Sequence, residues 1–342
     1  MNRKCNGERA VRGGTAGAAP IRAVLCAAAL SVLSGCASIA TRAVANALTG
    51  VGNSTVFTGD TDPELIGGAL PLAIKMYEAL LETQPNHDGL ILTTGSLFVM
   101  YATAFVQQPA EMLPPQELDR KKAGQERAKQ LYLRGVAILS RGLERRYPGI
   151  TGSGITGSGY TGQGGEDRAA ILARYTARMK KSDVPLIYWY VAGSVSAYAI
   201  DPFDLGLGTR LPALIALINR AYELDGNFNN GALDEFFVLF HASVPAALGG
   251  DPSKIGLHYE KALEKSQGRS AAAYLAYAQA VCIPAQDYAG FRQNLEAALA
   301  IDVNADPSSR LVNVINQRKA RYLLSRASWY FLEAEDEDDA LW

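Results

Sequence analysis

Apolar side chains recur at helical spacing along most of this chain, and no stretch shows sustained alternation of apolar and polar residues. In residues 214–224, for example, Leu214, Leu217, Ile218 and Ala221 lie three or four positions apart. This spacing places them on one face of an α-helix, whereas a half-buried strand alternates with period two. Alanine and leucine, two strong helix formers, supply 53 and 39 of the 342 residues. We therefore predict an all-α fold.

Three Asp-Pro pairs predict where helices begin: Asp62-Pro63, Asp251-Pro252 and Asp306-Pro307. Each places an acidic N-cap directly before a proline at the first helical position.

Four ten-residue stretches resemble one another, each with alanine at its fourth position: 76–85, 218–227, 259–268 and 295–304. In the last three, Ala221, Ala262 and Ala298 are 41 and 36 residues apart. A tetratricopeptide repeat (TPR) spans about 34 residues and is a helix–turn–helix that stacks on its neighbours. We therefore predict TPR-like helix–turn–helix pairs that form an α-solenoid over residues 61–330. A plain α-helical bundle is the alternative.

The N-terminal residues have the organisation of a secretory signal followed by a lipidation site. A basic stretch precedes the eleven-residue apolar run 23–33, which is too short to span a bilayer because that takes about 20 helical residues. Leu33-Ser34-Gly35-Cys36 then matches the bacterial lipobox, in which cleavage precedes a lipidated cysteine. We expect a signal peptide over 1–35, lipidation of Cys36 and a lipidated tether over 36–60.

Lipidation at Cys36 predicts a body held in the periplasm of the cell envelope by acyl chains in a membrane. Ala37 and Ser38 follow the cysteine, so no aspartate occupies the second position. This favours the outer over the inner membrane.

Composition and motifs exclude several classes of function. The 33 basic and 34 acidic residues give a net charge of −1, whereas nucleic-acid binders usually carry a basic excess. His87, His241 and His258 have no Cys or His partner at metal-ligand spacing, and neither GxSxG nor a P-loop occurs. We expect no enzyme activity, no metal, no cofactor and no nucleic-acid partner. Cys282 is expected to be a small buried hydrophobe.

Two segments are expected to lie outside the packed helices. Residues 149–165 contain eight glycines and two GxGxxG matches. A dinucleotide-binding loop needs a strand directly before such glycines, but here the preceding residues end a charged helix. The tandem GSGIT and GSGYT segments instead predict a flexible loop. Residues 331–342 are rich in Asp and Glu and are expected to form a solvated acidic tail.

Two aromatic segments are candidates for a ligand or partner surface. Tyr188, Trp189 and Tyr190 follow a predicted helix start, and Glu235 and Phe236 begin a second aromatic run. Successive residues of a helix point about 100° apart, so one packed face does not bury all three rings of the first segment. Packing in the core remains the alternative for both segments, because aromatic side chains dominate protein cores.

Seven stretches, in order, resemble the TatT family, the TPR-type lipoproteins associated with TRAP (tripartite ATP-independent periplasmic) transporters. They lie at 62–92, 101–107, 127–135, 183–189, 221–237, 274–302 and 310–326. The glycine run at 149–165 departs from the family pattern.

The resemblance implies a lipid-anchored all-helical protein, often a homotrimer, with a channel through each protomer. Its partner would be the periplasmic solute-binding subunit of a TRAP system, which imports a solute such as an organic acid or a hydrophobic ligand. A TPR scaffold lipoprotein in envelope or outer-membrane assembly is the alternative function.

Overall fold

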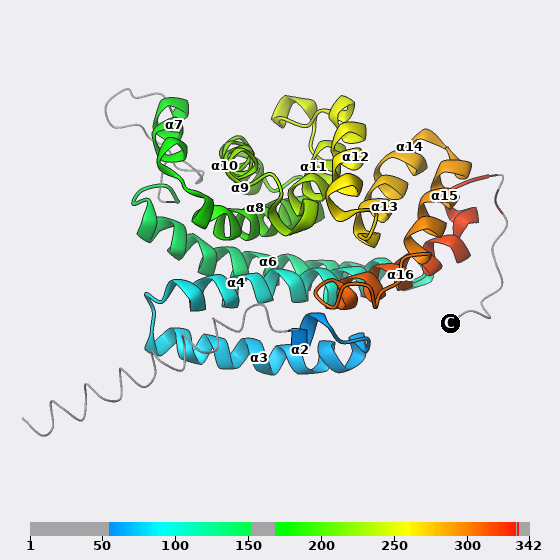
Figure 1. The fold of residues 1–342 in the computed structure, drawn as a ribbon, viewed down its shortest axis with the longest axis horizontal. Coiled ribbons are helices and arrows are strands. Elements are labelled where there is room, and N and C mark those ends of the chain that lie inside the picture. The colour runs from blue at the N-terminus through cyan, green and yellow to red at the C-terminus, as the bar shows by residue number, and fades with distance from the viewer. Residues whose placement is uncertain (1–54, 152–167, 333, 335–342) are drawn as a thin grey trace, which may run out of the picture.

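The computed structural model describes residues 55–151, 168–332 and 334, and every regular element within them is helical (Figure 1). This confirms the predicted all-α fold. The longer helices are α3 (Pro63–Thr83), α4 (Asp88–Ala102), α6 (Leu118–Arg146), α7 (Arg168–Arg178), α8 (Val184–Ile200), α10 (Leu211–Leu224), α11 (Ala232–Ser243), α12 (Ile255–Ser266), α15 (Tyr288–Leu299) and α16 (Arg310–Ser325). The shorter ones are α2 (Thr55–Thr58), α5 (Gln108–Glu111), α9 (Leu205–Gly208), α13 (Ala271–Tyr277) and α14 (Ile283–Ala285).

Side-chain caps start several of these helices. The carboxylate of Asp62 accepts a hydrogen bond from the backbone N–H of Leu65 at 3.0 Å, directly before Pro63 at the first position of α3. His87 Nδ1 accepts from the N–H of Leu90 at 3.1 Å and caps α4. Such caps satisfy backbone donors that have no partner inside the helix. The Asp-Pro pair at 62–63 is therefore a helix start, as the sequence predicts.

The Asp-Pro pairs at 251–252 and 306–307 are not followed directly by an α-helix. Asp251 caps the short 3₁₀ turn Pro252–Lys254, which leads directly into α12. Asp306 instead accepts from the N–H of Ser308 at 2.9 Å within a turn, and α16 begins only at Arg310. The prediction of a helix start at Asp306 was therefore wrong by one turn. The aspartate closes a local turn, which competes with helix initiation.

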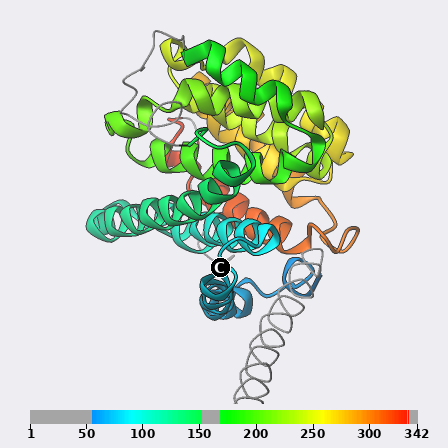
Figure 2. The ribbon, with the colours of Figure 1, turned by 90° about the vertical axis from the view of Figure 1, so that its left-hand side faces the viewer.

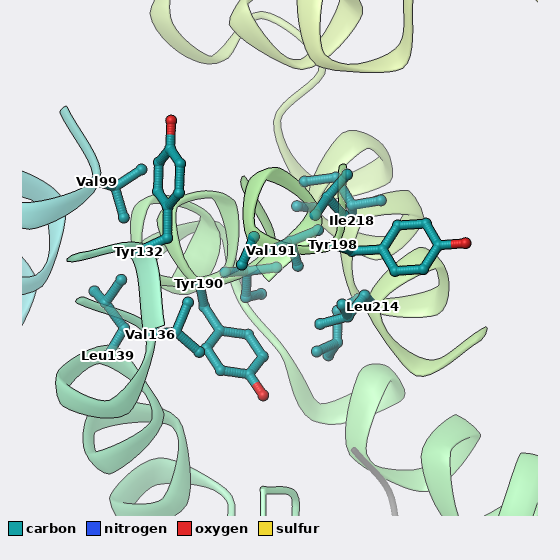
Figure 3. Packing of buried hydrophobic residues seen from close by; sticks show 14 of the residues in the cluster. Val99, Tyr132, Val136, Leu139, Tyr190, Val191, Tyr198, Leu214 and Ile218 are labelled. Atoms are coloured by element: carbon teal, nitrogen blue, oxygen red, sulfur yellow. The ribbon is translucent and has the colours of Figure 1, made fainter. Parts of the chain in front are cut away.

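Helices α3, α4, α6 and α8 lie one above another in Figure 1, with α4 packed between α3 and α6, and α6 between α4 and α8. Figure 2 shows the same order, with α3 at one edge of the molecule and the green and yellow helices on the opposite side. Figure 3 shows the main core, where side chains from α4, α6, α8 and α10 meet: Val99, Tyr132, Val136, Leu139, Tyr190, Val191, Tyr198, Leu214 and Ile218.

Glycines let the helices of this stack approach closely. A Cβ on Gly135 of α6 would lie 2.8 Å from the carbonyl oxygen of Gly95 on α4. A Cβ on Gly193 of α8 would lie 2.8 Å from Cγ2 of Val99 on α4. Both distances are below van der Waals contact, so these positions accept no side chain without movement of the helices.

Three of the four repeated alanines lie in the core, whereas Ala79 of α3 is exposed. Ala221 of α10, Ala262 of α12 and Ala298 of α15 have no exposed surface. Each belongs to a helix that packs against a neighbour, namely α8, α11 and α13 respectively. This burial agrees with the small residue that a TPR needs at the contact within a repeat. The TPR-like solenoid remains a prediction.

The last helix returns to the first ones and closes the molecule. Helix α16 contacts α2 and α3, and Arg310 donates to the carbonyl oxygen of Gly59 at 2.8 Å. Lys319 Nζ lies 2.8 Å from Oε2 of Glu111 on α5. Arg318 forms an ion pair with Glu64 on α3. Residues more than 200 positions apart in the sequence are thereby joined.

Residues at the edges of the predicted glycine-rich loop and acidic tail pack against the core. Ile150, in the predicted glycine-rich loop, has no exposed surface and belongs to the main core. Phe331, in the predicted acidic tail, is 2% exposed and lies 4.9 Å from Phe291 between ring centroids. Ala334 packs partly against the same cluster, so the packed body extends beyond residue 330. The signal peptide, Cys36, residues 37–54 of the tether, residues 152–165 and most of the tail lie outside the described residues.

Candidate functional site

The two aromatic segments singled out in the sequence meet in the structure. Tyr188 lies on α8 and Glu235 on α11, two helices that are in contact. Burial raises the pKa of Tyr188, and the charge of Glu235 adds to this shift. The Tyr188 ring lies 5.0 Å from the Trp189 ring and 5.2 Å from the Phe228 ring. All of these side chains are half-buried.

Glu235 is held at the first turn of α11 by one hydrogen bond. Ser270, which directly precedes α13, donates its hydroxyl to Oε1 of Glu235. Burial raises the pKa of Glu235 to about 7, the hydrogen bond from Ser270 opposes the shift, and the neighbouring charge of Asp234 adds to it. A carboxyl with this pKa exchanges its proton near neutral pH.

The remaining two predicted residues occupy different environments. Tyr190 is 3% exposed and belongs to the core between α6, α8 and α10 (Figure 3). Phe236 is half-buried, and its ring stacks on that of Phe240 at 5.7 Å. We define the α8–α11 site as Tyr188, Trp189, Phe228, Glu235, Phe236 and Ser270. Phe228 and Ser270 were not predicted, because neither stands in an aromatic run or a motif.

A buried charged cluster is centred on Asp234, the residue that precedes Glu235 on α11. Asp234 has no exposed surface, and its carboxylate contacts Nδ1 of His258 at 2.9 Å, Nζ of Lys265 and the hydroxyl of Tyr222 at 2.9 Å. Burial alone would raise the pKa of Asp234, but these hydrogen bonds outweigh it and hold the pKa below its usual range. The cluster ties α10, α11 and α12 together and fixes the helix that carries Glu235.

The adjacent histidine belongs to the same core. His241 is 6% exposed, its ring stacks on Phe237, and its Nδ1 accepts from the N–H of Asp251 at 3.1 Å. His241 is therefore a core histidine whose Nδ1 has a hydrogen-bond partner.

A second buried set of hydrogen-bonded side chains lies where α4 continues into the π-helical turn Thr103–Gln107. The hydroxyl of Tyr132 on α6 donates to Oε1 of Gln107 at 2.6 Å and shares a hydrogen bond of 2.8 Å with Thr103. Tyr132 has no exposed surface, so burial raises its pKa and keeps the phenol neutral. π-Helical turns inside α-helices are frequent at functional sites, and this one was not predicted.

One long apolar stretch runs through this region. By length and composition, Asp88–Glu111 is long and apolar enough to cross a membrane. Half of the 18 most apolar consecutive residues in this stretch are buried inside the fold. There α4 packs between α3 and α6. Core helices of water-exposed proteins have the same composition, so this property is weak evidence for a membrane span.

The similarity to known proteins covers almost all of the described body. Residues 59–331 match the protein family described as TRAP transporter T-component. The chain is also 34% identical over 278 residues to an uncharacterized protein of Treponema pallidum (strain Nichols), a region that covers 81% of this chain and 83% of that protein. This chain belongs to the TRAP transporter T-component family. Membership makes it a transporter component and associates it with other TRAP subunits and the cell envelope.

The described part of this T-component offers little for metal or thiol chemistry. Within it, no group of three or more His, Cys, Asp or Glu side chains is placed to hold a metal ion. Cys282 has no exposed surface, and burial raises the pKa of its thiol to about 11. A neutral, enclosed thiol packs as a small hydrophobe, as predicted.

Proposed function

We propose that this T-component is a lipid-anchored, non-enzymatic protein that docks the periplasmic solute-binding subunit of a TRAP transporter. The observation that carries the proposal is the family match over residues 59–331, which spans the described fold from α3 to the end of α16. In this account the protein forms a homotrimer, and the α8–α11 site contacts the solute or the subunit that delivers it. The resemblance implies an organic acid or a hydrophobic ligand as the solute.

The lipid anchor in this proposal is Cys36, supported by the lipobox of residues 33–36. Two or three acyl chains at one cysteine would hold the body at a membrane, because each buried CH₂ contributes about 0.8 kcal/mol. Cells that express the Cys36→Ala variant should incorporate no fatty-acid analogue into the protein and should retain the signal peptide. Labelling that persists in the variant would refute lipidation at this residue.

A crosslinked pull-down from native membranes tests the docking role. The expected result is enrichment of a TRAP solute-binding subunit over a pull-down with an unrelated lipoprotein of similar abundance. Enrichment of barrel-assembly proteins without any TRAP subunit would instead support the envelope scaffold and would contradict the proposed function.

A further inference from the structure

Helix α3 carries apolar residues on the face opposite the one that packs in the fold. The packed face, which meets α4, is formed by buried apolar residues: Ile66, Leu70, Ile74 and Leu81. On the opposite face Leu65, Leu72 and Met76 are 61%, 67% and 58% exposed. A surface helix normally turns charged and polar residues toward water. Three large apolar side chains in this position therefore indicate a contact with something other than water.

These side chains belong to one continuous row along α3. Exposed glycine and alanine residues occupy the neighbouring positions of the same face. Positions 65, 69, 72, 76 and 79 are spaced alternately by four and three, which keeps them on one stripe of a helix about 21 Å long. We call the following residues the α3 outer row: Leu65, Gly68, Ala69, Leu72, Met76 and Ala79.

No charged side chain of α3 interrupts the outer row. The exposed charged residues Glu64, Lys75 and Glu82 are spaced eleven and seven positions apart, so they form a separate row along one border. Glu64 pairs with Arg318 of α16, and Lys75 pairs with Glu78 at 2.7 Å. The outer row is thus an apolar strip with charges at its border, which is typical of surfaces that contact a partner or a membrane.

The outer row lies at an edge of the molecule. Helix α3 packs against α4 and contacts α16 near Glu64. Figures 1 and 2 both place α2 and α3 at the edge opposite α10, α11 and α12. Among the described helices none encloses the outer row, because its three large side chains each keep more than half of their surface.

The position of the predicted anchor indicates what covers this edge. Thr55, the first residue of α2, lies 19 positions after Cys36, so even a fully extended chain between them spans at most about 65 Å. Of the described helices, α2 and α3 are the nearest to Cys36 along the sequence. A body tethered over this distance meets the bilayer at high effective concentration. The edge where the tether enters the body is the one best placed to touch the bilayer.

A bilayer fits the outer row better than a protein partner does. A stable protein interface takes about 20–30 residues from each side, whereas the outer row consists of a few residues of one helix, and only Leu65, Leu72 and Met76 are large. A bilayer requires no matching surface, and acyl chains at Cys36 would supply most of the attachment. The row then has only to enter the boundary between headgroups and acyl chains, as the apolar faces of interfacial helices do.

We propose that the α3 outer row lies against the phospholipid bilayer to which the protein is anchored, with Leu65, Leu72 and Met76 among the acyl chains. Lys75, at the border of the row, extends its ammonium group into the headgroup region. Helix α3 then lies parallel to the membrane, and the opposite side of the molecule, with α10, α11 and α12, points away from it. This inference rests on the lipid anchor of the proposed function.

Spin labels on the lipidated mature protein in neutral phosphatidylcholine vesicles test the inference. One label is attached to Leu72→Cys, and the control label to Leu257→Cys, which replaces a 50% exposed leucine of α12. Cys282 is buried, and Cys36 would carry the lipid, so neither thiol reacts. We expect the ratio of relaxation by oxygen, which concentrates in lipid, to relaxation by a water-soluble nickel chelate to be at least about threefold higher at position 72 than at 257.

Three other results would overturn the inference. A label at position 72 that is open to the nickel chelate would show that the row faces water. A label shielded from both reagents, with spin–spin broadening, would show that a second copy covers the row. Shielding without broadening would assign the cover to a segment of the chain itself, such as residues 37–54.

Polar substitutions test whether the row causes the immersion. In protein labelled at Met76→Cys, the pair Leu65→Gln and Leu72→Gln should lower the oxygen-to-nickel ratio at least about twofold, because amide groups are costly to bury in lipid. Leu257→Gln is the matched control and should leave the ratio unchanged. Melting curves identify any variant that fails to fold. An unchanged ratio in the folded double variant would contradict the assignment.

The measurements separate this inference from the proposed function. A chain without lipid would not float with the vesicles, and this would refute the anchor together with the inference. A vesicle-bound chain whose label at position 72 faces water would refute the inference alone. The solute-binding subunit is absent from both measurements, so the docking proposal is decided independently by the pull-down.

Discussion

Two ionisable residues on α11, His241 and Glu235, have pKa values shifted in opposite directions by burial. Burial and the nearby His258 lower the pKa of His241 to about 4 from an ordinary value of 6.5. The unfolded state then binds more protons between pH 4 and 6.5. The contribution of His241 to stability is therefore complete above pH 6.5 and is lost as the pH falls toward 4, by at most about 3 kcal/mol.

Glu235 has the reverse effect. Its pKa rises to about 7 from an ordinary value of 4.5, so the folded state holds the proton between these limits. The stability that this proton contributes is present below pH 4.5 and is lost as the pH rises through 7. In the wild-type protein, the pH dependence of stability due to His241 and that due to Glu235 oppose each other between about pH 4.5 and 6.5.

Urea unfolding between pH 4.5 and 7 should separate the two residues. Relative to wild type, the free energy of unfolding of His241→Gln should decline as the pH rises, because the effect of Glu235 is no longer opposed. That of Glu235→Gln should increase as the pH rises. Val238→Ala, which truncates a buried, non-titrating residue of the same helix, serves as the control and should lower the free energy of unfolding equally at every pH. Parallel profiles for all four proteins would contradict the assigned burial.

Sequence reasoning found part of the α8–α11 site. Tyr188 and Glu235 were candidates because each stands in an aromatic run, but their proximity depends on contact between helices 47 residues apart. Ser270 gave no signal, since a serine before a helix predicts a cap. In the structure its hydroxyl binds Glu235 instead and forms no cap hydrogen bond.

At the scale of helices, the close contact of α4 with α6 depends on Gly135. Gly135→Ala should lower the free energy of unfolding by about 1–3 kcal/mol, because the added Cβ would meet the Gly95 carbonyl oxygen at 2.8 Å. Gly68→Ala is the matched control on α3, where nothing lies within 4 Å of the new Cβ. It should raise stability by about 0.5–1 kcal/mol through helix propensity. Urea unfolding measures both, and equal effects would contradict the packing described.

Helical periodicity predicts the all-α class and helices such as α10, but not the two π-helical turns. Thr103–Gln107 precedes Pro109 in α5, and Ala278–Cys282 precedes Pro284 in α14. A proline inside a helix lacks the N–H donor and crowds the preceding turn, and a wider turn relieves that conflict. Apolar spacing alone does not report such a local change in hydrogen bonding.

At the scale of the whole molecule, α16 closes the fold against its N-terminal helices. Lys319→Glu places a like charge beside Glu111, and both side chains are largely enclosed, with 15% and 32% of their surface exposed. We expect the free energy of unfolding to fall by about 1–3 kcal/mol. Glu111→Lys combined with Lys319→Glu restores opposite charges and should recover at least half of the loss. A double variant no more stable than the single one would show that this pair does not hold the closure.

This closure could not be read from the sequence. Lys319 and Glu111 are 208 positions apart. From the sequence of either helix alone, a charged residue is expected to face solvent and not another helix. Local periodicity specifies which face of α16 is apolar, but the partner of that face depends on how all the intervening helices stack.

Two purified proteins suffice to test whether this T-component docks a TRAP solute-binding subunit. Sedimentation velocity should show a faster-sedimenting complex whose amount saturates as the solute-binding subunit is titrated against the chain. An unrelated periplasmic protein of similar size and charge serves as the control and should sediment independently. If the solute-binding subunit and the chain also sediment independently at every concentration, up to about 100 μM, where even a weak complex would form, the claim is contradicted.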